Sequence, residues 1–189
     1  MIKNYNFYFL ILTLLATFLF HGLSAQSKVD SLQQLIDESK GVEKTKHLNT
    51  LAIEYLNSDL DKAITTATMA HQLAENLKDL NEQAKATHTI ADAWYYKNDL
   101  YKAVGFYKIS AEAEKELNGL QSENYVNRLG DIGYCYNALS LFDYAHEYFE
   151  KALVVAKQIN DIEETANNLN NLGHVNFAQG NYDKAIIIF

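Results

Sequence analysis

The sequence predicts an all-α fold in which helical hairpins stack side by side into a right-handed α-solenoid. Its 189 residues contain no proline, so no helix interior is broken by one. No glycine- or serine-rich linker divides the chain. Four segments also share one spacing of large, small and aromatic residues, which is the mark of an internal repeat. These three observations predict one continuous helical body.

Residues 1–25 have the pattern of a signal peptide. Lys3 is followed by the 14-residue apolar run 7–20, whereas a helix needs about 20 apolar residues to span a bilayer. The run is followed by Leu23-Ser24-Ala25, whose small residues suit cleavage before Gln26. We therefore expect export to the periplasm or another part of the cell envelope, the alternative being an uncleaved amphipathic or transmembrane start.

Residues 26–43 predict a solitary helix at the start of the solenoid. Leu32, Leu35 and Ile36 are three and four residues apart and so share one helical face. A solenoid needs such a cap to cover the apolar face of its first repeat.

Four hairpins follow, at about 44–81, 82–122, 123–161 and 162–189. The third has the clearest pattern, with large and small residues in a first helix and alanines and aromatics in a second: Leu129, Ile132, Gly133 and Tyr136, then Phe142, Ala145, Phe149 and Ala152. Small residues recur where the two helices of a hairpin should cross closely: Ala52, Ala91, Gly133 and Gly173 in first helices, Ala63, Ala103, Ala145 and Ala185 in second helices. Gly180 and Asn98 suit a positive φ in the turns.

These residues resemble the signature of the tetratricopeptide repeat over residues 28–189. The second-helix alanines lie 40, 42 and 40 residues apart, whereas the standard unit has about 34. This spacing is similar to the long-period variety and is expected to lengthen the second helix and its following turn. In the fourth copy Asn176 replaces the aromatic residue, so either Asn176 is partly exposed or its helix is rotated. That copy stops at Phe189, and we expect a truncated repeat.

Composition and motifs argue against several classes of function. Residues 1–25 hold one basic and no acidic residue, which leaves 15 basic against 24 acidic residues in the remainder and disfavours a nucleic-acid partner. No phosphate-binding loop, nucleophile elbow or zinc motif is present, so we expect no cofactor, no metal and no enzyme activity in these residues. Two pairs at i,i+4, His146/Glu150 and His88/Asp92, are interpreted as surface interactions. Cys135 is interpreted as a packed core residue.

The resemblance implies that first helices line a concave surface that binds peptides. Helix phase predicts the following groove residues: Asn49, His88, Asp92, Tyr95, Tyr96, Asn127, Tyr134, Asn137, Asn167, Asn170, His174 and Phe177. The chaperone-binding members of the family grip a terminal carboxylate with Lys, Arg and Asn. No Lys or Arg stands at the matching positions here, so binding of a terminal carboxylate is not expected. Those positions hold Asn49, Ile53, His88, Asp92, Gly130, Tyr134, Asn170 and His174.

Two main functions fit this pattern. The first is a protein- or peptide-binding scaffold of the cell envelope. The second is the extracytoplasmic input region of a longer signalling protein, because the layout resembles the N-terminal regions of sensor histidine kinases, including those of Bacteroidota. A membrane contact is expected only through the export signal or a downstream helix. A weaker third interpretation is a role in outer-envelope assembly.

Overall fold

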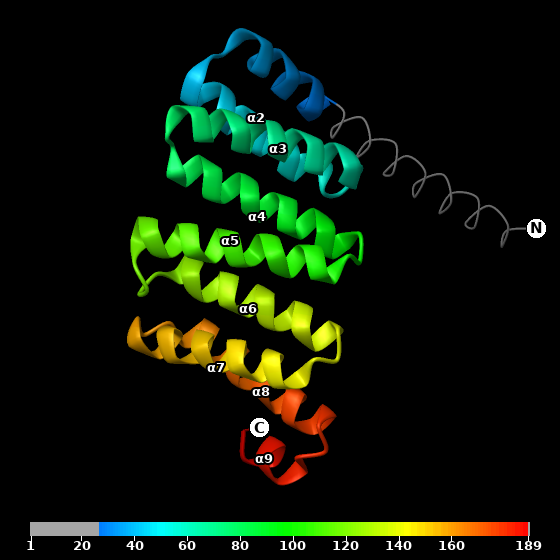
Figure 1. Cartoon of the computed structure of the whole chain (residues 1–189), viewed down its shortest axis with the longest axis vertical. Coiled ribbons are helices and arrows are strands. Elements are labelled where there is room, and N and C mark those ends of the chain that lie inside the picture. The colour runs from blue at the N-terminus through cyan, green and yellow to red at the C-terminus, as the bar shows by residue number, and fades with distance from the viewer. Residues whose placement is uncertain (1–26, 189) are drawn as a thin grey trace, which may run out of the picture.

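The computed structural model describes residues 27–188. The expected signal peptide, its cleavage point at Gln26, and Phe189 lie outside the described residues. A helix over residues 27–38 is followed by eight labelled helices (Figure 1). They are α2 (Gly41–Tyr55), α3 (Leu60–Leu77), α4 (Leu80–Tyr96), α5 (Leu100–Asn118), α6 (Glu123–Ala138), α7 (Phe142–Gln158), α8 (Ile162–Ala178) and α9 (Tyr182–Ile188). No strand occurs between residues 27 and 188, which confirms the all-α class.

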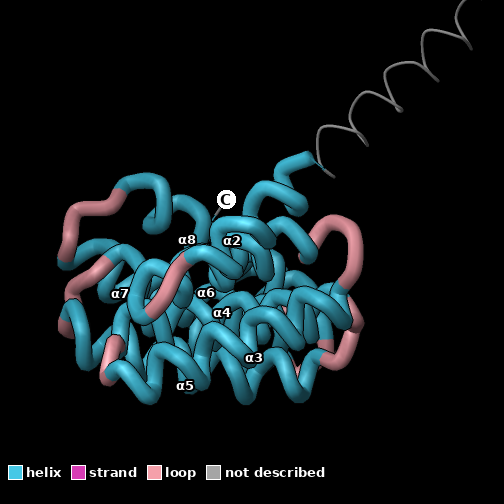
Figure 2. The backbone as a smooth tube through the Cα atoms, turned by 90° about the horizontal axis from the view of Figure 1, so that it is seen from above, coloured by secondary structure: helices cyan, strands magenta, loops and turns pink. Residues whose placement is uncertain are grey.

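The helices stack in chain order. Each packs against the next, and α2 also packs on α4 and α6 on α8. Seen from above, α3 and α5 lie on one side while α2, α4, α6 and α8 lie on the other (Figure 2). First helices therefore pack on first helices of the next hairpin, α2 on α4 and α6 on α8, which confirms the predicted solenoid.

Small residues allow the two helices of each hairpin to approach closely. Ala52 and Ala63 are fully buried, as are Ala91 and Ala103 in the next hairpin. At Gly133 a Cβ atom would stand 2.6 Å from Cε1 of Phe149, so only glycine fits against that ring. The predicted close crossings are confirmed at these positions.

Each of the six turns between α3 and α9 contains a residue with positive φ: Lys78, Asn98, Gly119, Ser140, Asn160 and Gly180. Asn98 has φ 61° and Gly180 has φ 78°, as predicted, and Ser140 occupies the same place between α6 and α7 with φ 58°. Beyond these residues the chain folds back on the helix it has left: Asp99 N–H donates to Trp94 O at 2.9 Å, and Leu141 N–H to Tyr136 O at 2.9 Å. This is the pattern of bonds that closes a helix with a left-handed residue.

Asn176 is buried, so the interpretation of a partly exposed side chain is wrong. It is 2% exposed, and its Nδ2 donates to Leu172 O of its own helix at 2.8 Å. An amide can replace the aromatic residue there because the neighbouring turn of α8 supplies its partner. Phe177, the next residue, is exposed instead.

The predicted cap segment and the observed helices differ slightly. The first helix covers residues 27–38, and α2 already begins at Gly41, inside the segment assigned to the cap. Leu32 and Ile36 are buried against Leu48 and Leu51 of α2, whereas Leu35 is exposed. Two of the three apolar residues of the cap therefore cover the first repeat. None of the described helices is long and apolar enough to cross a membrane.

Candidate functional site

The predicted groove residues lie on what we call the first-helix face, the exposed side of α2, α4, α6 and α8. Seven of the twelve are exposed: Tyr95, Tyr96, Tyr134, Asn167, Asn170, His174 and Phe177. Four are partly buried: His88, Asp92, Asn127 and Asn137. Asn49 alone among the twelve is buried.

Asn49 joins two repeats. Its Nδ2 donates to the backbone oxygen of Glu82 at 3.0 Å and to Glu82 Oε2 at 2.8 Å, which holds α2 against α4. Its Oδ1 is buried and has no hydrogen-bond partner among the described residues. The Asn49 amide is therefore already engaged within the fold, and only its carbonyl oxygen is unused. A ligand role for Asn49 stays a prediction.

The exposed aromatic side chains are held in place by neighbours. The Tyr134 hydroxyl accepts a hydrogen bond from Asn171 Nδ2 at 2.9 Å, and its ring meets Phe149 edge-on with centroids 5.3 Å apart. Phe177 packs edge-on against Tyr182 at 5.3 Å. Rings fixed in this way lose little conformational entropy when a ligand covers them.

Charged and polar side chains connect the second and third hairpins in a group that we call the junction cluster: His88, Asp92, Tyr107, Arg128 and Asp131. His88 Nε2 lies 3.3 Å from Asp92 Oδ1 and 3.6 Å from Asp131 Oδ2. The Tyr107 hydroxyl donates to Asp92 Oδ1 at 2.6 Å. Arg128 Nη1 lies 3.1 Å from Asp131 Oδ2 without hydrogen-bond geometry, and both its Nε and Nη1 are buried without a hydrogen-bond partner. The cluster thus joins α4, α5 and α6.

Burial changes the acidity of this cluster. It raises the pKa of Asp92 to about 6, although the bond from Tyr107 opposes the change. It also raises the pKa of Asp131 to about 6, where Arg128 opposes the change and the charges of Asp92 and Glu164 add to it. Desolvation likewise lowers the pKa of Arg128. The two carboxylates are therefore poorly compensated within the protein.

The predicted i,i+4 interaction of His88 and Asp92 is confirmed, but it is part of a larger cluster. The pair exists, but Asp131 of the next hairpin faces the same imidazole and Tyr107 holds the same carboxylate. The sequence reasoning missed Tyr107, Arg128 and Asp131. A signal was available, because Arg128 and Asp131 stand three residues apart, one turn before Tyr134.

Two other interpretations are confirmed. His146 and Glu150 form a surface pair with Nδ1 and Oε2 3.6 Å apart. Cys135 is fully buried, and burial, followed by the charges of Asp131 and Asp92, raises the pKa of its thiol to about 12. Among residues 27–188, no three His, Cys, Asp or Glu side chains are placed to hold a metal ion.

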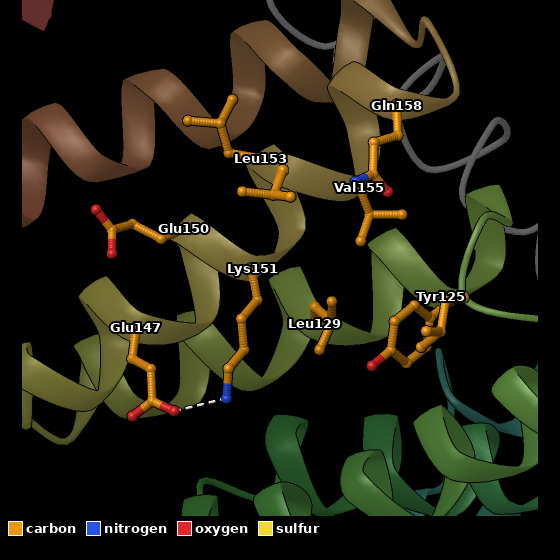
Figure 3. Close-up of a pocket in the computed structure, with 10 residues that line it drawn as sticks. Tyr125, Leu129, Glu147, Glu150, Lys151, Leu153, Val155 and Gln158 are labelled. Atoms are coloured by element: carbon orange, nitrogen blue, oxygen red, sulfur yellow. Dashed lines mark hydrogen bonds and ion pairs between the residues drawn. The ribbon is translucent and has the colours of Figure 1, made fainter.

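A second candidate surface is an apolar hollow of about 710 Å³ over α6 and α7. In Figure 3, Tyr125 and Leu129 rise from α6, while Glu147, Lys151 and Val155 line the hollow from α7. Leu129 belongs to the repeat pattern, but Tyr125, Leu153 and Val154 are particular to this hairpin. The positions 42 residues earlier in the second hairpin, equivalent to Tyr125, Leu129, Leu153 and Val154, hold Gln83, Thr87, Ala111 and Glu112. A local apolar surface of this kind suits contact with another molecule.

Comparison with known proteins agrees with this geometry. Residues 129–189 match the family model described as tetratricopeptide repeat. No curated protein matches the sequence.

Three solved structures share the fold. BtubC from P. vanneervenii has a TM-score of 0.73 at 22% identity, over 79% of this chain and 62% of its own. A putative kinesin light chain from Podosopora anserina, with nearly identical TPR-like repeats, has a TM-score of 0.74 at 14% identity, over 92% of this chain and 88% of its own. A Rap protein complexed with competence and sporulation factor has a TM-score of 0.67 at 16% identity, over 89% of this chain.

The chain spans 62% of the length of BtubC and 49% of the length of the Rap protein. At these identities the likeness concerns the fold alone. The described chain has the fold of TPR-like helical solenoids, and its residues 129–189 match the tetratricopeptide repeat model.

Proposed function

We propose that this chain is a non-catalytic interaction module that binds an extended segment of a protein or peptide on its first-helix face. The supporting observation is the composition of that face, where Tyr95, Tyr134 and Phe177 stand exposed among the amides Asn167 and Asn170. Fixed aromatic rings offer contact area, and amides can pair with an extended backbone. Stacked repeats present such side chains as one continuous surface.

The comparison with the Rap protein is consistent with this proposal. That protein shares the fold and was solved in complex with competence and sporulation factor. The present chain carries its own exposed aromatic and amide residues on the corresponding kind of scaffold. We propose a partner of the same general type, a protein or peptide, without transferring that specific ligand.

The experiment is selection of ligands from a displayed library of random 12-residue peptides, followed by affinity measurements with variants. Tyr134→Ala together with Phe177→Ala is expected to weaken the selected peptides at least 10-fold, since buried aromatic anchors often contribute 2 kcal/mol or more. The matched control is Tyr101→Ala, because Tyr101 is an exposed tyrosine of a second helix.

Three results would contradict the proposal: selection of no peptide, equal weakening by Tyr101→Ala, or no effect of the double variant. Circular dichroism of each variant checks that its helices remain folded. A loss of helix signal in the double variant would call for the single variants Tyr134→Phe and Phe177→Leu.

We further propose that the module works in the cell envelope after export. The support is the sequence pattern of residues 1–25, with Lys3, a short apolar run and small residues before Gln26. Expression of the whole chain in a bacterial host, cell fractionation and mass spectrometry of its N-terminus test this. A periplasmic product that begins at Gln26 supports export, and an intact cytoplasmic product contradicts it.

A second candidate function is the input region of a longer signalling protein. The support is the resemblance in layout: a signal sequence, a short cap helix and repeats with a spacing of about 40 residues. Reading the native gene past codon 189 tests it. A membrane helix followed by a kinase or DNA-binding domain supports this function, and a stop codon after a completed repeat contradicts it.

A further inference from the structure

We propose that the segment bound on the first-helix face presents a basic side chain, arginine or lysine, to Asp92 and Asp131. This inference rests on the proposed function and specifies the chemistry of its partner. The geometry, the charge balance and the aromatic surroundings of the junction cluster support it.

The geometry places two carboxylates from neighbouring repeats around one imidazole. The side chains of Asp92 and Asp131 are 21% and 30% exposed, so both reach the surface of the groove. A neutral imidazole has a single N–H and can donate it to one carboxylate only. Asp92 already accepts from the Tyr107 hydroxyl, whereas Asp131 faces Arg128 Nη1 at 3.1 Å without hydrogen-bond geometry. Asp131 can therefore accept a further donor, and a guanidinium or ammonium group supplies several.

The charge balance around the two carboxylates is negative. The groups that face them are His88 from α4, Tyr107 from α5, Arg128 from α6 and Glu164 from α8. These groups and the two aspartates comprise three carboxylates against one guanidinium and one imidazole, so carboxylates remain in excess even when His88 is charged. Burial is the main cause of the raised pKa of both aspartates, and the negative charges of Asp92 and Glu164 raise the pKa of Asp131 further. A cationic partner complements this site, and an acidic one is repelled.

Aromatic rings border the same place. Tyr95 stands one helical turn after Asp92 on α4, Tyr134 stands one turn after Asp131 on α6, and their side chains are 37% and 44% exposed. A cation over an aromatic face gains roughly 0.5–2 kcal/mol in addition to its ion pair. The occupant that fits both features is an extended segment with a basic residue between apolar or aromatic neighbours.

The test uses three pools of acetylated, amidated 11-residue peptides that are random except for a central Arg, Met or Glu. Binding of each pool to the full chain is measured by fluorescence anisotropy at pH 7.5 and low salt. The Arg pool is expected to bind at least 10-fold more tightly than the Met pool, and the Glu pool most weakly. The double variant Asp92→Asn/Asp131→Asn should bind the Arg pool no more tightly than the Met pool.

A matched control variant changes the net charge by the same amount at positions outside the junction cluster. Asp37→Asn/Asp183→Asn alters two exposed aspartates, one in the helix of residues 27–38 and one in α9, and should leave the Arg preference unchanged. The preference should also weaken at least 5-fold as the pH falls from 7.5 to 5, because both carboxylates take up protons near pH 6.

The outcomes separate the two proposals. Equal binding of the Arg and Met pools, or an Arg preference that survives in Asp92→Asn/Asp131→Asn, overturns the basic partner while peptide binding itself stands. Binding by none of the three pools overturns the proposed function together with this inference.

Discussion

At the scale of single residues, the crossing of α6 and α7 depends on a glycine. The Phe149 ring is almost fully buried and lies against Gly133, where α6 and α7 cross. Tyr134, the next residue, packs edge-on against the same ring and belongs to the first-helix face. Packing inside the third hairpin therefore fixes the position of a candidate binding residue.

The change Gly133→Ala should lower the free energy of unfolding by about 1–3 kcal/mol, because the new methyl group overlaps a ring that cannot move freely. Gly130→Ala is the matched control on the same helix, where nothing lies within 4 Å of the new Cβ. The control should leave the free energy of unfolding unchanged or raise it by about 0.5–1 kcal/mol, because alanine has a higher helix propensity than glycine. Urea unfolding followed by circular dichroism measures both, and equal effects would contradict the close contact.

The junction cluster makes a prediction about pH. The pKa of Asp131 is 3.8 in an ordinary environment and about 6 in the fold, so the native state holds this proton more tightly. Its contribution to stability is fully present below about pH 4 and is lost as the pH rises through 6. Asp131→Asn should therefore gain stability relative to the natural protein between pH 4 and 7.5, by at most about 3 kcal/mol.

Thermal unfolding of both proteins at pH 4.5 and 7.5 tests this expectation. A difference between the two proteins that is the same at both pH values would contradict it. A variant that is less stable at pH 7.5 would show that the ion pair with Arg128 outweighs the burial of Asp131.

At the scale of helices, the turns are built from residues that serve two helices. Asp79, Asp99 and Asp161 each donate their backbone N–H to the helix that ends: Asp79 to Ala74 O, Asp99 to Trp94 O and Asp161 to Ala156 O, at 2.9 Å in each case. The side chain of each then accepts from the third residue beyond it and so caps the next helix. One residue thus ends one helix and begins another.

Ser140 offers a test of these turns, because it holds a φ of 58° without being glycine. Ser140→Gly should raise the free energy of unfolding by about 0.5–1 kcal/mol, since glycine adopts this conformation without strain. Ser58, in the turn between α2 and α3, does not have positive φ. The control Ser58→Gly should lower the free energy of unfolding by a similar amount, because glycine adds conformational freedom to the unfolded chain. Urea midpoints that move in the same direction would contradict the strain at Ser140.

At the scale of the whole molecule, stability should vary along the stack. Each repeat contacts only its neighbours, so a helix inside the stack has partners on both sides and a terminal one does not. In the 189-residue chain, we expect the slowest amide hydrogen exchange in α4, α5 and α6 and faster exchange in the helix of residues 27–38 and in α9. Uniform protection over residues 27–188 would instead indicate unfolding in a single cooperative step.

The fold could be predicted from the sequence because its determinants are local and repeated. The residues that specify the crossings and turns, such as Gly133, Asn98 and Gly180, occur at fixed intervals and have one physical reason each. The candidate site was predicted in part, since helix phase identified the exposed side chains Tyr95, Tyr134 and Phe177.

The remainder of the site depends on contacts between repeats. Helix phase cannot show that Asp131 faces His88, or that Tyr107 reaches Asp92 from a second helix. It also could not show that the Asn49 amide is engaged by Glu82. These pairings arise only when neighbouring hairpins are superimposed at their actual rotation and spacing.

Asp99 and Asp161 each bond to the helix before them and cap the helix after them, so these turns contain no spare residue. One extra residue at Asp99 or Asp161 would separate the end of one helix from the cap of the next, and each residue added within a helix turns the rest of that helix by about 100°. Side chains such as Asp92 and Asp131 would then face different directions. The chemistry of the first-helix face can accordingly change by exchange of side chains, whereas a residue added at one of these turns would change which side chains face one another.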